Sequence, residues 1–238
     1  MRSGVRIGVV IPALNEEQAI GQVIADIPDW VDEIVVADNG SSDRTIDIAR
    51  RAGARVVTES DRGYGAACQA GLRALGPTDV IVFLDGDYSD DPREMAAIVD
   101  PILSDSVELV IGSRVTGNAA PGALSPHQRF GNWFACLLMQ WLFATCFSDL
   151  GPFRAIRAGS LQRLQMRDRN YGWTVEMQIK AAQLGLAVQE VPVSYRPRIG
   201  VSKISGTFRG SFMAGVTILR VIARSVRVPA FATVSQNR

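Results

Sequence analysis

Residues 80–92 read VIVFLDGDYSDDP, an apolar run followed directly by an acidic turn. The turn places four aspartates close together: Asp85, Asp87, Asp90 and Asp91. Carboxylates at this spacing repel one another at neutral pH, so either water screens them at the surface or a bound cation offsets the repulsion. Other segments of the sequence are needed to choose between these two interpretations.

Apolar runs alternate with helical patterns over the first half of the chain, which predicts an α/β fold. Strands are expected over residues 6–11, 32–38, 54–60 and 79–85. Nearly continuous apolar strands that alternate with helices are typical of a mostly parallel central sheet with helices on both faces. Ligands of such sheets bind beyond the carboxyl ends of the strands. The segments Pro12–Glu16, Asp38–Asp43 and Asp85–Asp91 all fall at those ends.

The acidic turn does not fit a calcium-binding EF-hand loop. Asp85, Asp87 and Ser89 match its first, third and fifth positions. Its sixth position requires glycine and its twelfth a bidentate glutamate, whereas the chain has Asp90 and Ala96 there. The EF-hand is therefore excluded.

A dinucleotide site at residues 63–71, GYGAACQAG, is also unsupported. Cys68 replaces the third glycine of that fingerprint, and the segment does not follow the first strand. The glycines still permit a turn or a close backbone approach. The third candidate is an Asp-x-Asp turn that binds Mg²⁺ or Mn²⁺ against a diphosphate, because hard oxygen ligands suit these ions. From the residues alone, this site and a solvated acidic turn both remain open.

Charge is distributed unevenly along the 238 residues, although the net charge is only +1. Residues 1–108 carry 20 acidic and nine basic side chains, whereas residues 109–238 carry four acidic and 16 basic ones. This asymmetry predicts a cation near one part of the fold and an anion near the other. No nucleic-acid partner is expected. Three widely spaced cysteines favour a reducing compartment, and no signal peptide is expected.

The second half is more apolar and more basic. A strand is predicted over residues 108–115, followed by a loop over residues 116–126 that is rich in glycine and proline. Residues 130–147 are uncharged but diluted by polar side chains, so a buried or interface-lying helix is expected rather than a membrane span. Residues 187–198 predict an edge strand, and residues 211–228 a basic amphipathic helix.

Several segments together resemble the family-2 glycosyltransferases, which have the GT-A nucleotide-sugar fold. The matching segments within residues 7–92 are VVIPALNEE, VVADNGSSDRT, DRGYGAACQAGL and LDGDYSDDP. The segments VIGSRV, DLGPFRAIR, YGWTVEMQIKA and EVPVSYRPRIGVSKISGT extend the likeness to about residue 207. The subgroup that the chain resembles most is that of the dolichyl- and polyprenyl-phosphate mannose synthases.

The resemblance implies a donor site for a nucleotide-diphosphate sugar, linked to UDP or GDP. Pro12, Leu14 and Glu16 fall where the family surrounds the nucleobase and ribose, and Asp38 where a carboxylate contacts the base. Asp85 also falls among the donor contacts.

Asp85 and Asp87 fall on the family's Asp-x-Asp motif, which implies Mg²⁺ or Mn²⁺ as cofactor. Two positions depart from the pattern. Leu14 stands where the family often has tyrosine, and Ser89 stands where the synthases often have glutamine near the metal.

The resemblance also implies catalytic residues. Arg114 and Arg129 match basic positions that line the donor diphosphate and the acceptor phosphate. If the acceptor is a hydroxyl, a general base is needed, and Asp149 is the first candidate, ahead of Glu176. The structural alternative for Asp149 is an ion pair with Arg154 or a helix cap.

A phosphate acceptor changes this requirement, because its second pKa lies near ~6 and it needs no base. It needs cations instead, and Arg129 and Lys203 are the predicted ligands. The apolar run and the basic C-terminal helix suit a lipid and an anionic membrane surface.

These features together predict a metal-dependent, inverting glycosyltransferase that moves a hexose to a polyprenyl phosphate. The alternative is transfer to the hydroxyl of a soluble acceptor with Asp149 as base. Residues 1–207 are predicted to form the GT-A domain, and residues 208–238 a basic amphipathic extension that associates with the membrane. The expected location is cytoplasmic, peripheral at the inner face of the membrane.

Overall fold

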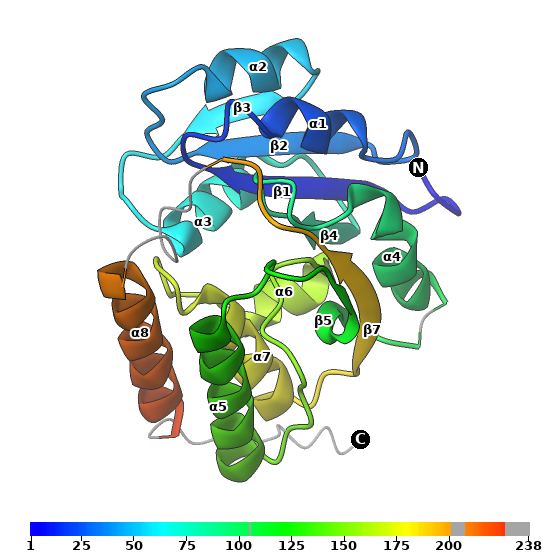
Figure 1. The fold of residues 1–238 in the computed structure, drawn as a ribbon. Coiled ribbons are helices and arrows are strands. Elements are labelled where there is room, and N and C mark those ends of the chain that lie inside the picture. Colours follow the sequence, from blue (N-terminus) through cyan, green and yellow to red (C-terminus); the bar gives the residue numbers. More distant parts are fainter. Residues whose placement is uncertain (105, 201–207, 227–238) are drawn as a thin grey trace.

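The computed structural model describes residues 1–104, 106–200 and 208–226 (Figure 1). Its sheet has seven strands in the order β3-β2-β1-β4-β6-β5-β7. The strands are β1 Ile7–Ala13, β2 Glu33–Asp38, β3 Arg55–Thr58, β4 Val80–Phe83, β5 Leu109–Ala119, β6 Arg154–Arg157 and β7 Val188–Tyr195. The helices are α1 Ile20–Ala25, α2 Thr45–Arg51, α3 Tyr64–Ala74, α4 Met95–Leu103, α5 Pro126–Phe143, α6 Ala158–Leu164, α7 Trp173–Gln183 and α8 Phe208–Val226, with a 3-10 turn at Pro92–Glu94.

Helices cover both faces of the sheet, as the apolar strands predict. Along β1, Val9 and Ile11 pack with α1, α2 and α4, whereas Val10 packs on the opposite face with α3, α6 and α7. This alternation follows from the two-residue period of a strand. The predicted α/β fold with a mostly parallel sheet is confirmed, since only β6 runs antiparallel to its neighbours β4 and β5.

The strand β6 is absent from the predicted elements. Its residues, Arg154–Arg157, insert between β4 and β5, where Arg154 pairs with Phe83 on one side and Ile111 on the other. The arginines at both ends of this four-residue segment hide its apolar centre in the sequence. Only pairing on both edges makes it a central strand.

The loop predicted over residues 116–126 is wrong in its first part. β5 continues to Ala119 after an irregularity between Ser113 and Asn118, and Asn118 pairs with Ser194 of β7. A Cβ atom at Gly117 would lie 2.1 Å from the Val193 carbonyl oxygen, so the glycine lets the two backbones approach. Strand pairing here overrides the turn tendency of the sequence. The predicted edge position of β7 is confirmed.

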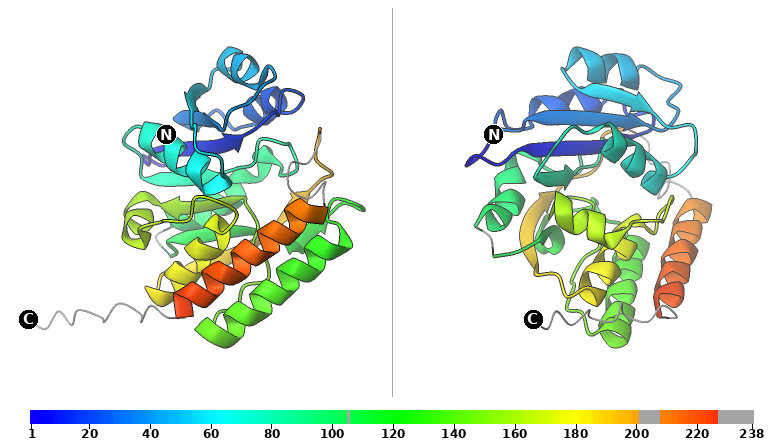
Figure 2. Two further views of the ribbon diagram at one scale, coloured as in Figure 1. Left: turned by 90° about the vertical axis from the view of Figure 1, so that its left-hand side faces the viewer. Right: turned by 180° about the vertical axis from the view of Figure 1, so that it is seen from behind.

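Helices α5, α7 and α8 form a third apolar cluster beside the sheet. Met139 of α5, Val175 and Ile179 of α7 and Ile222 of α8 are buried together. Figure 2 shows α5 and α8 lying side by side along this part of the molecule. The predicted C-terminal helix therefore exists and packs against α5 and α7, with Arg220 and Arg224 exposed.

The apolar run 130–147 lies mostly in α5, which begins at Pro126 after a capping box made by Ser125 and Gln128. Its outer face exposes aromatic side chains, including Trp133 and Trp141. Within the described ranges, no helix combines the length and the apolar character that a bilayer crossing requires.

Candidate active site

The acidic turn lies where parallel-sheet proteins bind ligands. β4 ends at Phe83, next to the end of β1, and Asp85 and Asp87 follow directly. Both aspartates line a cavity of about 300 Å³. Of the residues predicted for the donor site, Pro12, Leu14 and Glu16 line the same cavity.

The two aspartates are fixed differently. Asp85 accepts a hydrogen bond of 2.9 Å from the Tyr64 hydroxyl. One oxygen of Asp87, Oδ1, accepts from the backbone N–H and the hydroxyl of Ser89 at 3.0 and 2.5 Å. The other, Oδ2, lies 3.3 Å from the guanidinium of Arg198. Burial and the neighbouring charge of Asp87 raise the pKa of Asp85 to about 7.

This arrangement fits a divalent cation. No cluster of three or more His, Cys, Asp or Glu side chains suited to a metal occurs among the residues described. Magnesium commonly needs only one or two carboxylates when phosphate oxygens complete its shell. A cation would also relieve the repulsion that raises the pKa of Asp85. Ser89, at the position of the expected third ligand, donates to Asp87 and orients it.

Asp90 is buried in the same turn. Burial and the charges of Asp85 and Asp87 raise its pKa well above the ordinary value. Asp91 instead pairs with Arg93 and Arg196 at the surface. The four aspartates thus divide into two that line the cavity and two that do not.

Asp38, also predicted for the donor site, is the last residue of β2 and does not line the cavity, although the next residue, Asn39, does. It is fully buried, and its Oδ2 accepts from the backbone N–H groups of Gly40 and Ser41, both at 3.0 Å. Its Oδ1 is buried and has no hydrogen-bond partner among the described residues. The carboxylate therefore fixes the turn at residues 38–41 through one of its two oxygens.

A loop without a predicted role completes the cavity that contains Asp85 and Asp87. Asn170 and Tyr171 line it together with Leu14 and Glu16. The carboxylate of Glu176 fixes this loop by accepting backbone N–H bonds from residues 167 and 168. Glu176, the second candidate for a general base, therefore holds the backbone of this loop in place.

The Gly-Tyr-Gly segment, residues 63–65, explains how closely this loop approaches the start of α3. A Cβ at Gly63 would lie 2.0 Å from the carbonyl oxygen of Arg169, and one at Gly65 2.2 Å from that of Asp168. The first N–H groups of α3 donate to loop carbonyls, including Gly65 N–H to Asn170. The glycines were expected to allow either a plain turn or a close backbone approach. The structure shows the close approach. The glycines indicate that some backbone comes close, but they do not identify which segment of the chain it is.

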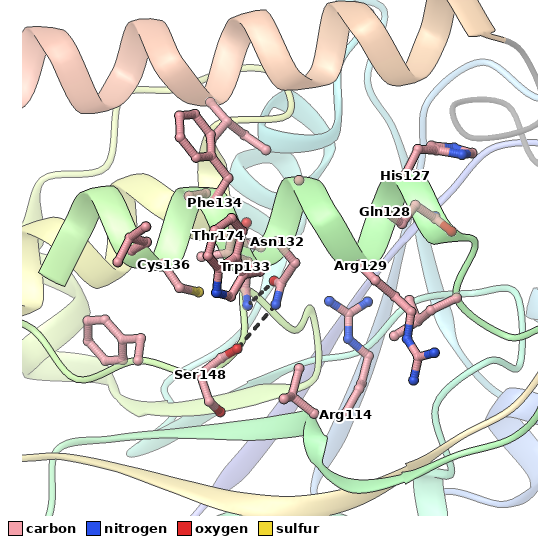
Figure 3. Close-up of a pocket in the computed structure, with 18 of the residues that line it drawn as sticks. Arg114, His127, Gln128, Arg129, Asn132, Trp133, Phe134, Cys136, Ser148 and Thr174 are labelled. Carbon is pink, nitrogen blue, oxygen red and sulfur yellow. Dashed lines mark hydrogen bonds between the residues drawn. The ribbon is translucent and has the colours of Figure 1, made fainter.

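A second cavity, of about 780 Å³, lies between α5, α8 and the end of β5. Its apolar wall includes Trp133, Phe134, Leu137, Ile218 and Leu219. Arg114 from β5 and Arg129 from α5 both line it, and Figure 3 shows them pointing into the same end. The two arginines predicted for phosphate binding are therefore brought together. His127 also lines this cavity, at the exposed start of α5.

Asp149 is fully buried and contacts Arg114 through both carboxylate oxygens. Oδ2 accepts from the Arg114 backbone N–H and Nε at 2.7 and 2.8 Å, and Oδ1 from Nη2 at 2.7 Å. Burial alone would lower the pKa of Arg114, but the hydrogen bonds that Arg114 donates to Asp149 and the negative charge of that carboxylate outweigh it and raise that pKa. Arg154, the partner considered for Asp149, instead donates to the carbonyls of Gly151 and Thr174. Asp149 thus orients Arg114.

The predicted phosphate ligand Lys203 lies outside the described residues.

Comparisons with known proteins agree with this geometry. A family model described as glycosyl transferase family 2 matches residues 8–165. A dolichyl-phosphate hexose transferase of Haloferax volcanii is 36% identical over 90% of this chain and 93% of its own length. An undecaprenyl-phosphate mannosyltransferase of Micrococcus luteus is 28% identical over 92% of this chain and 96% of its own.

A crystal structure of glucosyl-3-phosphoglycerate synthase from Mycobacterium tuberculosis, in complex with Mn²⁺, UDP and phosphoglyceric acid, superposes with a TM-score of 0.79. It is 26% identical, and the likeness covers 95% of this chain and 80% of that one.

Proposed function

The chain belongs to glycosyl transferase family 2 and is a glycosyltransferase, and from that membership we propose its donor, its acceptor and its cofactor. It transfers a hexose, with inversion, from a nucleotide-diphosphate sugar to a polyprenyl phosphate, and it requires Mg²⁺ or Mn²⁺. The cavity that contains Asp85 and Asp87 is the donor site, and the larger cavity that contains Arg114 and Arg129 is the acceptor site.

In the donor site, Asp85 and Asp87 bind the cation, and Pro12, Leu14 and Glu16 border the nucleoside. The bound metal would offset the charge that develops on the leaving diphosphate. The superposed synthase supports this assignment, since its crystals contain Mn²⁺ and UDP. The free acceptor oxygen of Asp38 suits an N–H of the base.

The acceptor proposal depends on one observation, the combination of an apolar wall and two arginines at one end of a single cavity. A polyprenyl phosphate has this same combination of a hydrocarbon chain and an anionic end. The phosphate is already ionised at neutral pH, so it attacks without a general base. The burial of Asp149 and its contacts with Arg114 support this choice, because both of its oxygens already accept hydrogen bonds. The names of the two lipid-phosphate transferases that resemble the chain support it as well.

The outer face of α5 suits a membrane surface. Phe130, Trp133 and Trp141 are 64%, 56% and 82% exposed, and Arg220 and Arg224 are exposed on the neighbouring α8. Exposed aromatic residues beside basic ones are typical of helices that lie at an anionic bilayer interface. We place the enzyme at the cytoplasmic face of the membrane as a peripheral protein, with Lys203 as a further phosphate ligand.

Transfer to lipid can be measured directly. Purified protein is incubated with Mn²⁺, undecaprenyl phosphate and a panel of labelled UDP- and GDP-sugars, and the lipid is then extracted. Label is expected in the lipid phase with one donor and is expected to vanish with EDTA or Asp87→Ala. Asp91→Asn is the matched control, because Asp91 lies in the same turn but outside the cavity. No lipid label with any donor would refute the lipid acceptor.

Transfer to a soluble phosphorylated acceptor is the second candidate. The superposed synthase contains phosphoglyceric acid, and two arginines in one cavity also suit the phosphate of a small acid. The same panel distinguishes the two candidates if water-soluble phosphorylated acids replace the lipid. Asp149 would then be the base for the attacking hydroxyl.

A further inference from the structure

Residues 148–150 lie outside the helices and strands, and side chains from neighbouring elements hold their backbone. Glu190 of β7 accepts the N–H groups of Ser148 and Asp149 at 3.0 and 3.2 Å. Gln178 of α7 donates its Nε2 to the Asp149 carbonyl at 2.9 Å. These bonds take the place of the pairing that a helix or strand would give to the same backbone groups. The position of the Asp149 carboxylate therefore depends on side chains of other elements.

Asn132 of α5 supplies a third support for this segment. Its Nδ2 donates to the Ser148 carbonyl at 3.1 Å (Figure 3), and its Oδ1 accepts from the Leu150 N–H at 2.9 Å. Both polar groups of the amide are therefore used, one on each side of Asp149. Aspartate lacks the donor and leucine lacks both groups, so this pair of contacts depends on the amide.

The contact links the two arginines of the proposed acceptor cavity. Arg129 precedes Asn132 by three residues, so both lie on one face of α5. Arg114 belongs to β5 and is oriented by Asp149, which lies between the two backbone groups that Asn132 binds. The apolar contacts of α5 are mainly with α7 and α8. Asn132 thus connects the helix that carries Arg129 to the segment that orients Arg114.

We infer that Asn132 is a positioning residue of the acceptor site, which sets the separation of Arg114 and Arg129 so that both bind one phosphate. This inference rests on the proposed function. A phosphate monoester offers three terminal oxygens, and two planar guanidinium groups share them only when they are held at a suitable separation. Without the amide, α5 would keep its apolar contacts but lose its link to residues 148–150. Arg129 would then no longer be fixed relative to Arg114.

Binding of a soluble phosphate monoester tests the inference without any turnover. Farnesyl phosphate, a short polyprenyl phosphate, and phosphoglyceric acid are each titrated into the protein in a calorimeter. Wild type is compared with Asn132→Ala, Arg129→Gln and the double variant. Gln183→Ala is the matched control, because the Gln183 amide of α7 also donates to a backbone carbonyl, that of Ser225 in α8, but lies outside the two cavities of the described structure.

Asn132→Ala is expected to bind farnesyl phosphate about tenfold more weakly than wild type, which corresponds to ~1.4 kcal/mol. In the Arg129→Gln background, the same substitution should weaken binding less than about threefold, because no second guanidinium remains to be positioned. The affinities of Asn132→Ala for Mn²⁺ and for UDP or GDP should match those of wild type. Gln183→Ala should retain the wild-type affinity for farnesyl phosphate. Asn132→Leu, which is close to asparagine in shape, replaces the alanine variant if that variant does not fold, and the same losses are expected.

Unchanged binding of farnesyl phosphate by Asn132→Ala, or by Asn132→Leu in its place, would overturn the inference. So would equal losses with and without Arg129, or a parallel loss of nucleotide affinity, since either indicates general damage to the fold. In these cases wild type still binds the phosphate, and the proposed acceptor site stands. If wild type binds only phosphoglyceric acid, the lipid acceptor is refuted, and the same comparison made with that ligand decides the inference. If wild type binds neither ligand, the proposed acceptor site and this inference fail together.

Discussion

Replacing Asp149 with asparagine distinguishes a carboxylate that orients Arg114 from one that removes a proton. In the structure, Asp149 accepts three hydrogen bonds from Arg114, and its side chain has no exposed surface. Asparagine keeps the shape and one acceptor oxygen, but it loses the charge and turns an N–H₂ group toward the guanidinium. Arg114 is then left without its counter-charge in a site where its side chain is 13% exposed.

The expected loss in the free energy of unfolding of Asp149→Asn follows from this burial. Removing one partner of a buried ion pair costs about 3–5 kcal/mol, and the remaining acceptor of asparagine favours the lower limit. A domain of this size loses about 2–4 °C in Tm for each kcal/mol, so a decrease of roughly 6–12 °C is expected. Transfer to lipid phosphate should fall about tenfold to a hundredfold, because a preorganised cation at the acceptor phosphate loses its orientation.

A double-mutant cycle isolates the mechanism. Single-turnover transfer is measured for Asp149→Asn, for Arg114→Gln and for the double variant. If Asp149 acts through Arg114, Asp149→Asn in the Arg114→Gln background should lower the transfer rate less than about threefold. The effects of mutating two residues in direct contact are not additive.

General-base catalysis gives the opposite pattern. A missing base lowers the rate by about 10²- to 10⁴-fold, and this loss would persist in the Arg114→Gln background. The orienting role would be refuted if the rate losses of the two single variants multiply in the double variant and Tm is nearly unchanged in Asp149→Asn. That result would favour the hydroxyl acceptor.

Three further changes have expected outcomes. Asp87→Ala should abolish Mn²⁺-dependent transfer while leaving the far-UV circular dichroism unchanged, and residual metal-dependent turnover would contradict its role as ligand. Gly63→Ala should lower stability in urea by about 2 kcal/mol or more, because φ is +148° and the new Cβ meets the carbonyl of Arg169. Gly159→Ala, a helical position with open space, should be neutral or stabilising, and equal losses at both sites would be unexpected. Trp141→Ser should weaken sedimentation with anionic vesicles without changing Tm, since the side chain is 82% exposed; unchanged binding would argue against α5 as the membrane contact.

The gathering of Asp85, Asp87 and Glu16 around one cavity was predictable because its signals are local. Apolar strands followed by carboxylates identify both the sheet and the edge where Asp85 and Asp87 meet Glu16. The contact between Arg198 and Glu16 was not predictable, since it joins residues that are 182 positions apart. The short strand β6 and the loop at Asn170 depend in the same way on tertiary pairing, which a single sequence does not show.

If the proposed function is right, the charge asymmetry of the sequence follows from a reaction between two anions. Under the proposed function, a metal-bound diphosphate and an anionic lipid phosphate must approach each other, and their charges oppose this. The guanidinium of Arg114 lies over the Tyr195 ring at 4.9 Å, and the backbone of Tyr195 pairs with Asp90 of the acidic turn. One aromatic residue thus joins the acidic donor site to the basic acceptor site. Asp85 and Asp87 would hold a metal that offsets the diphosphate charge, and Arg114 would offset the charge of the acceptor phosphate, so removing either cation should prevent transfer even when the other substrate is bound.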